Sequence, residues 1–386
     1  MQTKQGKYVE ELLATAGVTI GTHPLCDIQV RDEGVIPRLI AGGDLAIAEA
    51  YMYRKWTTDD LFEILYKVFT SEIEGHLRRN KWATLKLLFR SLVANPNAIW
   101  RSRRAAAKAY DLPDPLYEYM LEGGDYSCHR YITGKESLAE AREIKWRGLA
   151  AKMHLEPGMR VIEIGCGEGG FAAWLAETFD VEVVAVTNSR RHAERARERC
   201  KGLRVTVLLA DYRHLPPMQL FDRAVSVGML EHVGTKNLRR FMRIVCELLL
   251  PRGIFVCHYI CGSGRLNAFL RKYVFPDGVV PPMWMVECAA YPYFRAAEDW
   301  ENFGWDYHLT LLQWYRNCVK HRAKIESECG EILAKIFGSF DRFWRVWVEF
   351  YLLGTAARFK ARKISVGQAV YVKGGTEGVY HTSRPY

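Results

Sequence analysis

The spacing of apolar residues divides the chain into a helical first part and a later part in which strands and helices alternate. Over residues 17–32, apolar and polar residues alternate around turn formers, which predicts one or two short strands. Apolar residues then recur at helical spacing up to Phe69, with the segment Thr57–Asp60 as a predicted helix start. We therefore expect a small, mainly helical N-terminal domain, residues 1–104.

Short runs rich in β-branched residues follow, separated by helical segments. Alternation of this kind is typical of a doubly wound α/β sheet of parallel strands, and it predicts a second domain over residues 105–386. Long helical, aromatic-rich sequence interrupts the pattern over residues 262–350, and QAVYVKG supplies a late strand. The five runs are MRVIEIGCG, EVVAVTNS, RVTVLLAD, FDRAVSVGM and GIFVCHYI.

Basic side chains gather in residues 76–110, which contain no Asp or Glu. With Trp82 and Trp100 among them, these residues form either a basic amphipathic helix on an anionic membrane surface or a solvated face whose apolar stripe packs on the protein. The formal net charge of the chain is +10, with a pI near 9.0. This balance favours an acidic partner, which is a nucleic acid, an anionic lipid or a phosphorylated substrate. No sequence motif typical of nucleic-acid recognition accompanies the basic residues, so we expect no nucleic-acid partner.

Nothing in the sequence predicts export or a membrane span. The apolar run around Gly253–Ile260 is far shorter than the ~18 residues that a spanning helix needs. The N-terminus lacks the apolar core of a secretory signal. Ten cysteines lie at irregular spacing, which is typical of reduced thiols in a cytoplasmic protein rather than of a disulfide scaffold.

A glycine-rich loop follows the first predicted strand of the second domain. Gly165, Gly167 and Gly170 satisfy the GxGxxG pattern of dinucleotide-binding proteins, while Gly165, Gly167 and Gly169 satisfy the GxGxG pattern of S-adenosylmethionine (SAM) enzymes. Glycine at such a turn lets the backbone bend sharply and approach a ligand. A purely structural glycine turn is the remaining alternative.

The ends of the next two predicted strands favour SAM. A nicotinamide-binding unit needs an acidic residue at the end of the second strand to hold the ribose hydroxyls. Here that strand ends in Thr187-Asn188-Ser189, without an acid. Asp211 and Tyr212 follow the third strand, where they could meet an adenine ring.

The blocks around these strands resemble the cyclopropane-fatty-acid synthase family of SAM-dependent methyltransferases, which includes the mycolic-acid cyclopropane synthases. The resemblance covers most of the chain, in several ordered blocks. They are ELLATAGVTI, YDL, YSC, LEPGMRVIEIGCG, VSVGMLEHVG, EDWENFGWDYHLTLLQWY and FKARKISVGQAVYV.

The resemblance implies a Rossmann-like class I methyltransferase that moves a methyl group from SAM onto a cis double bond of a phospholipid acyl chain. A bound bicarbonate ion is the family's presumed base, and no metal is implied. The implied SAM residues are Tyr110, Gly165, Gly167, Gly169, Thr187, Asp211 and Tyr212. The implied catalytic and bicarbonate residues are Cys128, Glu231, His258, Ile260 and Tyr315, with Cys128 and Ile260 acting through the backbone.

Topology supports part of this set independently. Glu231 follows the fourth strand and His258 lies near the end of the fifth, so both are expected at the carboxyl edge of the sheet, where such folds bind ligands. Cys257 and Cys261 flank His258 at a spacing that could suggest a metal, but a second ligand pair is missing, so we interpret them as small apolar residues. The resemblance further implies a homodimer that works at the cytoplasmic face of a membrane.

Several positions depart from the family pattern. Glu168 replaces an aromatic residue, His192 a Gln and Thr355 a Cys, and His129-Arg130 follow the YSC block where Ala and an aromatic residue are usual. Two alternatives to cyclopropanation therefore stay open. One is methyl transfer to carbon or nitrogen of another lipid or a small molecule, and the other is an inactive lipid-binding relative.

Overall fold

The fold is described from a computed structural model, which covers residues 4–31, 36–71, 73, 112–263, 266–276, 278–376 and 380–382. Three features of the sequence lie outside these residues. They are the whole basic segment 76–110, the boundary predicted at residue 104, and Tyr110.

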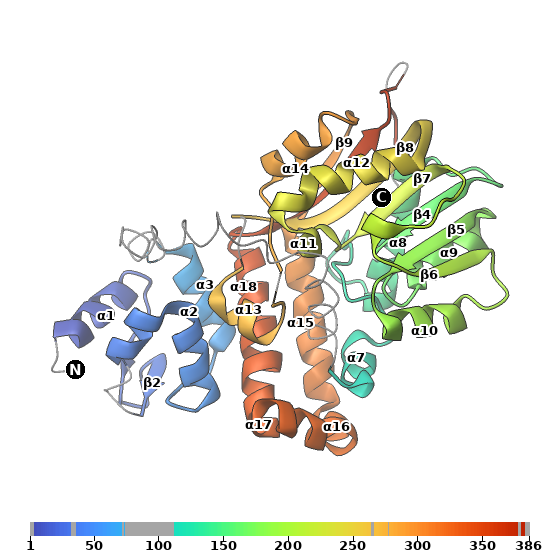
Figure 1. The fold of residues 1–386 in the computed structure, drawn as a ribbon. Helices are drawn as coiled ribbons and strands as arrows, with labels where there is room; N and C mark the ends of the chain where they lie inside the picture. Colours follow the sequence, from blue (N-terminus) through green and yellow to red (C-terminus); the bar gives the residue numbers. More distant parts are fainter. Residues whose placement is uncertain are drawn as a thin grey trace.

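A seven-stranded sheet forms the larger part of the molecule, with the strand order β6-β5-β4-β7-β8-β10-β9 (Figure 1). The five predicted runs form its first five strands, which pair in parallel. The doubly wound α/β class is thus confirmed. The strands are β4 (Arg160–Ile164), β5 (Glu182–Thr187), β6 (Val205–Leu209), β7 (Phe221–Val227), β8 (Leu249–Cys261), β9 (Arg295–Asn302) and β10 (Ser365–Val372).

One edge of the sheet is antiparallel. β10 runs antiparallel to both β8 and β9. β9 itself lies inside residues 262–350, which we expected to be helical. Its sequence, RAAEDWEN, has few residues of high strand propensity. Pairing with β10 therefore decides its conformation, which local sequence patterns do not reveal.

Helices cover both faces of the sheet. One face packs against α8 and α9 through a core that includes Leu149, Phe171 and Val256, and α10 lies over β6 at the end of the sheet. The other face packs against α12 and α14 through Phe241, Val286 and Phe255. The helices around the sheet are α8 (Leu138–Met153), α9 (Gly170–Phe179), α10 (Arg190–Arg199), α11 (Leu230–Val233), α12 (Leu238–Leu248) and α14 (Met283–Ala290). α13 (Ala268–Tyr273) packs instead into the core of the N-terminal residues.

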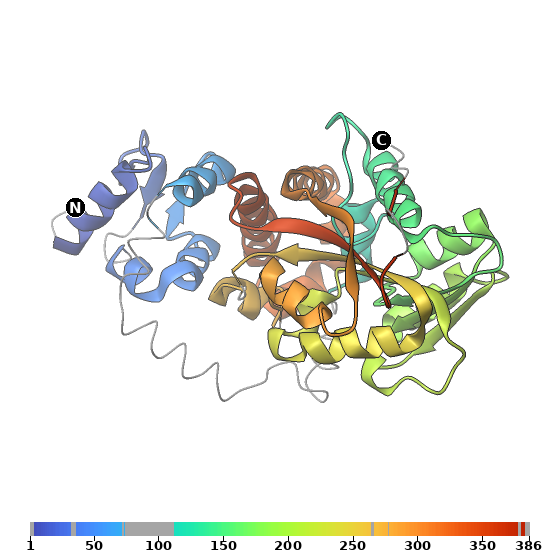
Figure 2. The same ribbon diagram turned by 90° about the horizontal axis from the view of Figure 1, so that it is seen from above.

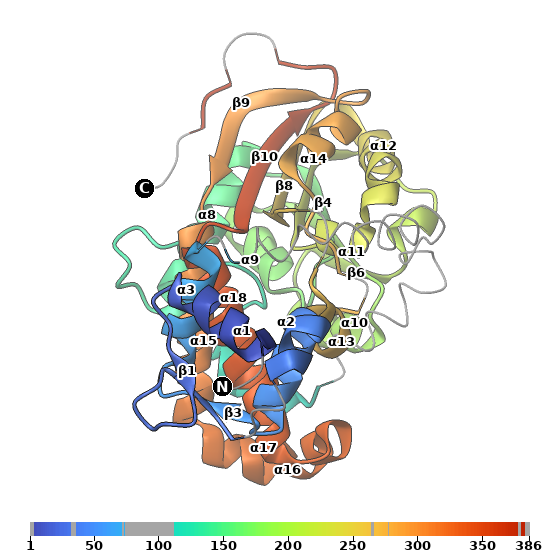
Figure 3. The same ribbon diagram turned by 90° about the vertical axis from the view of Figure 1, so that its left-hand side faces the viewer.

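A second group of helices stands beside the sheet and joins it to the N-terminal residues (Figures 2 and 3). One apolar core unites residues of this group with N-terminal residues such as Trp56 and Leu61. The N-terminal helices therefore pack on this second group of helices. The group comprises α7 (Asp114–Leu121), α15 (Gly304–Lys320), α16 (Arg322–Phe337), α17 (Phe340–Phe343), the π-helix η4 (Trp344–Leu353) and α18 (Gly354–Lys360).

The N-terminal residues contain both kinds of element that the pattern predicts. β1 (Ile20–Gly21), β2 (Ile28–Val30) and β3 (Trp56–Thr57) form a small sheet beside α1 (Lys4–Ala14), α2 (Ile36–Met52) and α3 (Leu61–Thr70). Asp60 begins α3, because its carboxylate accepts a 2.9 Å hydrogen bond from the Glu63 amide. Among the described helices, none has the length and apolar character needed to cross a membrane.

Candidate active site

A large cavity opens at the carboxyl ends of β4, β5, β6 and β7, where open α/β sheets bind their ligands. The predicted glycine loop forms one wall. Gly165 has a φ of +90°, and a Cβ atom there would lie 3.1 Å from the Met229 Cβ. Gly167 has a φ of +52°, so both positions favour glycine. The backbone of this loop can thus approach a ligand closely.

Gly169 has a different role from the one expected. It does not line the cavity but lies at the start of α9, with a φ of +77°. A Cβ atom there would come within 2.9 Å of the Ala196 Cβ on α10. Gly169 therefore allows close packing of α9 on α10, and the spacing of glycines alone does not separate this role from ligand binding.

Thr187, Asp211 and Tyr212 line the same cavity. Asp211 is buried, and Arg213 binds it through two hydrogen bonds, of 2.8 Å from Nε and 2.5 Å from Nη2. Burial raises the pKa of the Asp211 carboxyl, but the Arg213 contacts outweigh this effect and hold the pKa below its usual value. Asp211 is thus a fixed carboxylate at the cavity wall.

Sequence reasoning missed a polar group at the inner end of the cavity. Lys145 donates to Asp125 at 2.9 Å and to Ser127 at 2.8 Å, and Trp146 also donates to Asp125 at 2.9 Å. Glu163 lies beside them, 3% exposed, and its Oε2 has no hydrogen-bond partner among the described residues. Burial, with Asp125 nearby, raises the pKa of Glu163 to about 8. Glu163, the acidic residue within VIEIG at the end of a predicted strand, was the signal in the sequence that could have revealed this group.

The residues that depart from the family pattern near the glycine loop lie at the rim of this cavity. Glu168 forms an ion pair with Arg195 at 3.1 Å, and Arg195 also pairs with Asp114 of α7 at 2.6 Å. His192 lines the cavity, and burial, followed by the charges of Arg191 and Arg195, lowers its pKa to about 4. His192 is therefore a neutral side chain near neutral pH.

Glu231 lies on the short helix α11, next to the cavity. Its neighbours His232 and Val233 line the cavity wall, while Glu231 itself is buried against β8. The Glu231 Oε1 accepts a 2.6 Å hydrogen bond from the amide of Ile260, and its Oε2 has no partner among the described residues. Burial raises the pKa of Glu231 to about 7. This carboxyl therefore holds a proton in a large fraction of molecules at neutral pH.

His258 and Ile260 share one face of β8, since residues two apart along a strand point the same way. His258 is 3% exposed, and its Nδ1 lies 3.0 Å from the Gln368 Nε2. Cys257 and Cys261 point to the other face, into the core under α12 and α14. Both are buried thiols, as we interpreted them.

Cys128 is a buried thiol next to His129 in the chain. It is 1% exposed, its thiol donates to the His129 carbonyl at 3.1 Å, and His129 is one of the groups whose charge acts on His258. Burial raises the pKa of the Cys128 thiol well above its usual value. Such a thiol is a poor nucleophile, which leaves the backbone role that we expected.

Tyr315 is not brought to this site. It is half-buried on α15, and burial raises its pKa, with further effects from Glu349, Asp60 and Arg322. It thus faces the N-terminal helices, and the prediction for Tyr315 needs correction. Tyr307, two turns earlier on α15, is buried beside Trp314 and is close enough to Tyr126 to raise its pKa.

Aromatic side chains separate the cavity from the helices beside the sheet. Tyr126 lines the cavity, its ring stacks on Trp314 at 5.1 Å, and its hydroxyl lies 2.6 Å from that of Tyr351. Phe275 packs against both tyrosines. Tyr351 belongs to η4, so the aromatic stretch 339–353 is buried core that also reaches the cavity wall.

Comparison with known proteins decides the family. The family described as mycolic acid cyclopropane synthetase matches residues 99–369. This chain belongs to that family. A curated relative, cyclopropane-fatty-acyl-phospholipid synthase of Escherichia coli K12, is 36% identical over 378 residues, which cover 97% of this chain and 94% of the relative.

Solved structures of the family agree with the fold. The cyclopropane synthase MmaA2 from Mycobacterium tuberculosis is 26% identical, with a TM-score of 0.62 over 70% of this chain and 98% of that one. Mycolic acid cyclopropane synthase CmaA1, solved with SAH and CTAB, is 25% identical with the same TM-score and coverage. Coclaurine N-methyltransferase, at 17% identity, shares the fold with a TM-score of 0.68 over 85% of this chain and 99% of that one.

Proposed function

We propose that this protein transfers a methylene group from SAM to the cis double bond of an unsaturated acyl chain in a phospholipid, which forms a cyclopropane ring. The observation that carries the proposal is the position of Glu231. This buried carboxyl, with an unpaired Oε2, directly precedes two residues of the cofactor cavity. A methyl donor in the cavity would thus lie next to a polar group that can accept or donate a proton.

The cavity suits SAM at both ends. Gly165 and Gly167 let the backbone approach the ligand, and Asp211 and Tyr212 form a wall suited to its adenosine. Lys145, Asp125 and Glu163 surround the other end, where a ligand with both an amine and a carboxylate finds partners of opposite charge. The buried unpaired Oε2 of Glu163 supports a ligand there.

An alkene is a weak nucleophile, so the protein must position it and protect the cation that forms. Tyr126, backed by Trp314 and Tyr351, gives the cavity an aromatic wall against which an acyl chain could lie beside the donor. Aromatic faces attract positive charge, and exclusion of water prevents capture of the carbocation on the acyl chain. Ring closure then requires that one proton leave the transferred methyl group.

A bicarbonate ion fits the polar group around Glu231. It would be held by Glu231, His258, Tyr307 and the backbone near Cys128 and Ile260, and when bound it would supply a base for the departing proton. The raised pKa of Glu231 removes the repulsion between a carboxylate and an anion, because a protonated Oε2 donates a hydrogen bond. Among the described residues, no hydrogen bond uses the His258 Nε2, which leaves that atom for the ion.

We further propose that the protein acts as a homodimer at the cytoplasmic face of an anionic membrane. The net charge of +10 supports attraction to such a surface. Co-sedimentation with vesicles of neutral and of anionic phospholipid tests the surface, and sedimentation velocity tests the dimer. Equal binding to both kinds of vesicle, or a monomer at assay concentration, would contradict these points.

Purified protein, SAM and vesicles of unsaturated phospholipid test the activity directly. We expect acyl chains one methylene heavier by gas chromatography and mass spectrometry, with less product after removal of bicarbonate. Glu231→Ala should lower kcat by roughly 10²- to 10³-fold with little change in SAM affinity, and Glu231→Gln, which keeps a neutral donor, should lower it less. An unchanged kcat in Glu231→Ala would contradict the proposed site.

A further inference from the structure

His258 belongs to a row of side chains that crosses three strands. Gln368 of β10 lies directly opposite His258 of β8 on one side and opposite Glu301 of β9 on the other. Directly opposed residues of antiparallel strands point to the same face of a sheet. Lys152, from the last turn of α8, reaches this row from the helix layer above it.

Lys152 determines how the amide of Gln368 is oriented. The Lys152 Nζ lies 2.6 Å from the Gln368 Oε1 and also pairs with Glu301. A lysine ammonium has donors and no acceptor, so the atom that faces it must be the amide oxygen. The amide nitrogen of Gln368 must then face His258, at 3.0 Å from Nδ1. All four side chains are at most 8% exposed, so water does not compete for these contacts.

The direction of this hydrogen bond determines which ring nitrogen of His258 carries the proton. An amide NH₂ only donates, so Nδ1 must accept with its lone pair. A neutral imidazole that accepts at Nδ1 carries its proton on Nε2. We propose that Gln368, oriented by Lys152, is a positioning residue that holds His258 as the neutral Nε2–H tautomer, so that Nε2 donates to the anion of the active site.

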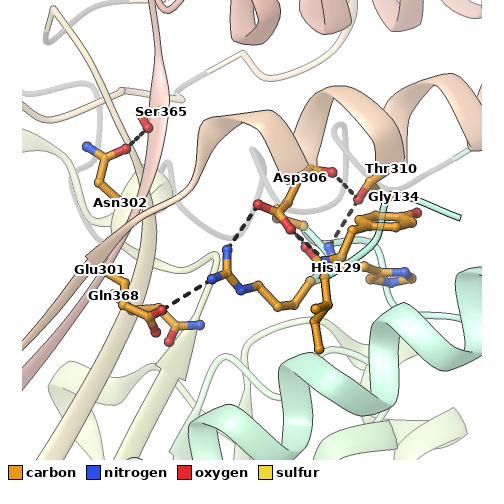
Figure 4. Close-up of polar contacts among 12 residues, drawn as sticks. His129, Gly134, Glu301, Asn302, Asp306, Thr310, Ser365 and Gln368 are labelled. Atoms are coloured by element: carbon orange, nitrogen blue, oxygen red, sulfur yellow. Dashed lines mark hydrogen bonds and ion pairs between the residues drawn. The ribbon is translucent and has the colours of Figure 1, made fainter. Parts of the chain in front are cut away.

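Charge balance around the row supports a neutral His258. Lys152 pairs with Glu301, and Glu301 also contacts Arg130 at 3.4 Å. Arg130 pairs in turn with Asp306 at 3.1 Å, and Figure 4 shows Glu301 and Asp306 on either side of this arginine. Two cations thus meet two carboxylates, and the group has no net charge that would favour an imidazolium. Arg130, one of the departures from the family pattern, completes this balance.

The groups that face His258 also favour its neutral form. Burial, followed by the charges of Lys145, Lys152 and His129, lowers the pKa of His258 well below its usual value. Phe303, which follows β9 at the start of α15, packs against the ring at 5.7 Å between centroids. His258 therefore works as a fixed hydrogen-bond donor and does not exchange its proton in each turnover.

This inference rests on the proposed function only for what Nε2 binds, so its first test uses no substrate. Protein with ¹⁵N-labelled histidine is measured by long-range ¹H–¹⁵N correlation from pH 5.5 to 8.5, with His258→Gln to assign the signals. We expect His258 neutral throughout, with an unprotonated Nδ1 and a protonated Nε2. A proton on Nδ1 in the wild type would overturn the proposal whether or not the enzyme makes cyclopropanes.

The variant Gln368→Glu tests the positioning role. Its carboxylate still accepts from Lys152 but can only accept from His258, so Nδ1 should gain a proton and the pKa of His258 should rise. We expect kcat to fall about 10- to 100-fold, as is typical when a residue that orients another is changed, with the SAM KM within about threefold. An unchanged Nδ1 signal, or an unchanged kcat beside a protonated Nδ1, would overturn the role.

Gln313→Glu is the matched control. Gln313 is half-buried on α15 and donates to Asn317 at 3.1 Å, away from the row. Gln313→Glu adds the same charge to the protein as Gln368→Glu, and we expect it to leave the His258 signals and kcat unchanged. If both variants lower kcat equally while the His258 signals stay as in the wild type, the loss is structural and the proposal fails.

Discussion

The wall of the cofactor cavity includes residues at the ends of four neighbouring parallel strands, whereas the surroundings of His258 come from four separate segments, around Lys152, His258, Glu301 and Gln368. The first region needs little more than glycines with positive φ at a strand end. The second needs a helix and three strands in the correct register, so that Lys152, Gln368 and the His258 Nδ1 meet in one row. We therefore expect changes in the second region to affect both folding and chemistry, and changes in the first to affect mainly binding.

Lys152→Met should give the largest effect, on stability. It removes a buried ammonium, so that the Gln368 carbonyl loses its donor and the Glu301 carboxylate loses its Lys152 pair and keeps the longer contact with Arg130. Loss of one member of a buried ion pair costs roughly 3–5 kcal/mol of unfolding free energy. Urea unfolding followed by circular dichroism measures this loss.

The double variant Lys152→Met with Glu301→Gln is its control. It removes the carboxylate that has lost its Lys152 pair and should recover part of the stability. Equal stability of Lys152→Met and the wild type would show that the row does not support the fold.

Gly165→Ala should weaken SAM binding about 100-fold with a smaller effect on stability. The added Cβ meets the side chain of Met229 and disfavours the φ of +90° that shapes the loop. Isothermal titration calorimetry measures the change in Kd. Gly202→Ala is the control, since Gly202 has a φ of +83° with nothing near its Cβ position and does not line the cavity. Equal losses of affinity in the two variants would contradict a local role for Gly165.

The pH dependence of kcat/KM should show an alkaline limb that belongs to Glu231. The Glu231 Oε2 donates only when it is protonated, and its pKa is about 7. Activity should therefore fall about tenfold per pH unit above that value, at constant bicarbonate concentration. In Glu231→Gln the limb should disappear, because an amide does not titrate. A limb that persists there would assign the proton to another group.

Glu168→Gln should have the smallest effect. Glu168 lies at the rim of the cavity, and its ion pair with Arg195 joins two side chains that are each 29% exposed. Such a pair contributes at most about 1 kcal/mol. Thermal unfolding and SAM titration should both stay close to the wild type, with Kd within about threefold. A tenfold weaker Kd would show that this departure from the family pattern reaches the cofactor.

The sequence predicted much of the cofactor cavity but little of the surroundings of His258. Gly165, Gly167 and the residues at the ends of β5 and β6 were predictable because each follows a strand with a clear pattern. Gln368 and Lys152 carry no such signal, since only the antiparallel placement of β10 brings Gln368 to His258. The fold shows the same limit at β9, because only its pairing with β10 decides its conformation.

Tyr315 shows where resemblance alone is insufficient. Residues on one helix share sequence context, but only packing decides which turn reaches the site. α15 presents Tyr307 toward Tyr126 and Tyr315 toward Glu349. Gly169 is a similar case, because a motif glycine serves helix packing as readily as ligand binding.

Transfer from SAM with a trideuterated methyl group to vesicles of unsaturated phospholipid tests the central claim most directly. If the protein closes a cyclopropane ring, one deuteron leaves the transferred group, and mass spectrometry of the acyl chains will find two deuterons in the product. Retention of all three deuterons in a methylated product, or no labelled acyl chain in any vesicle, would contradict the account.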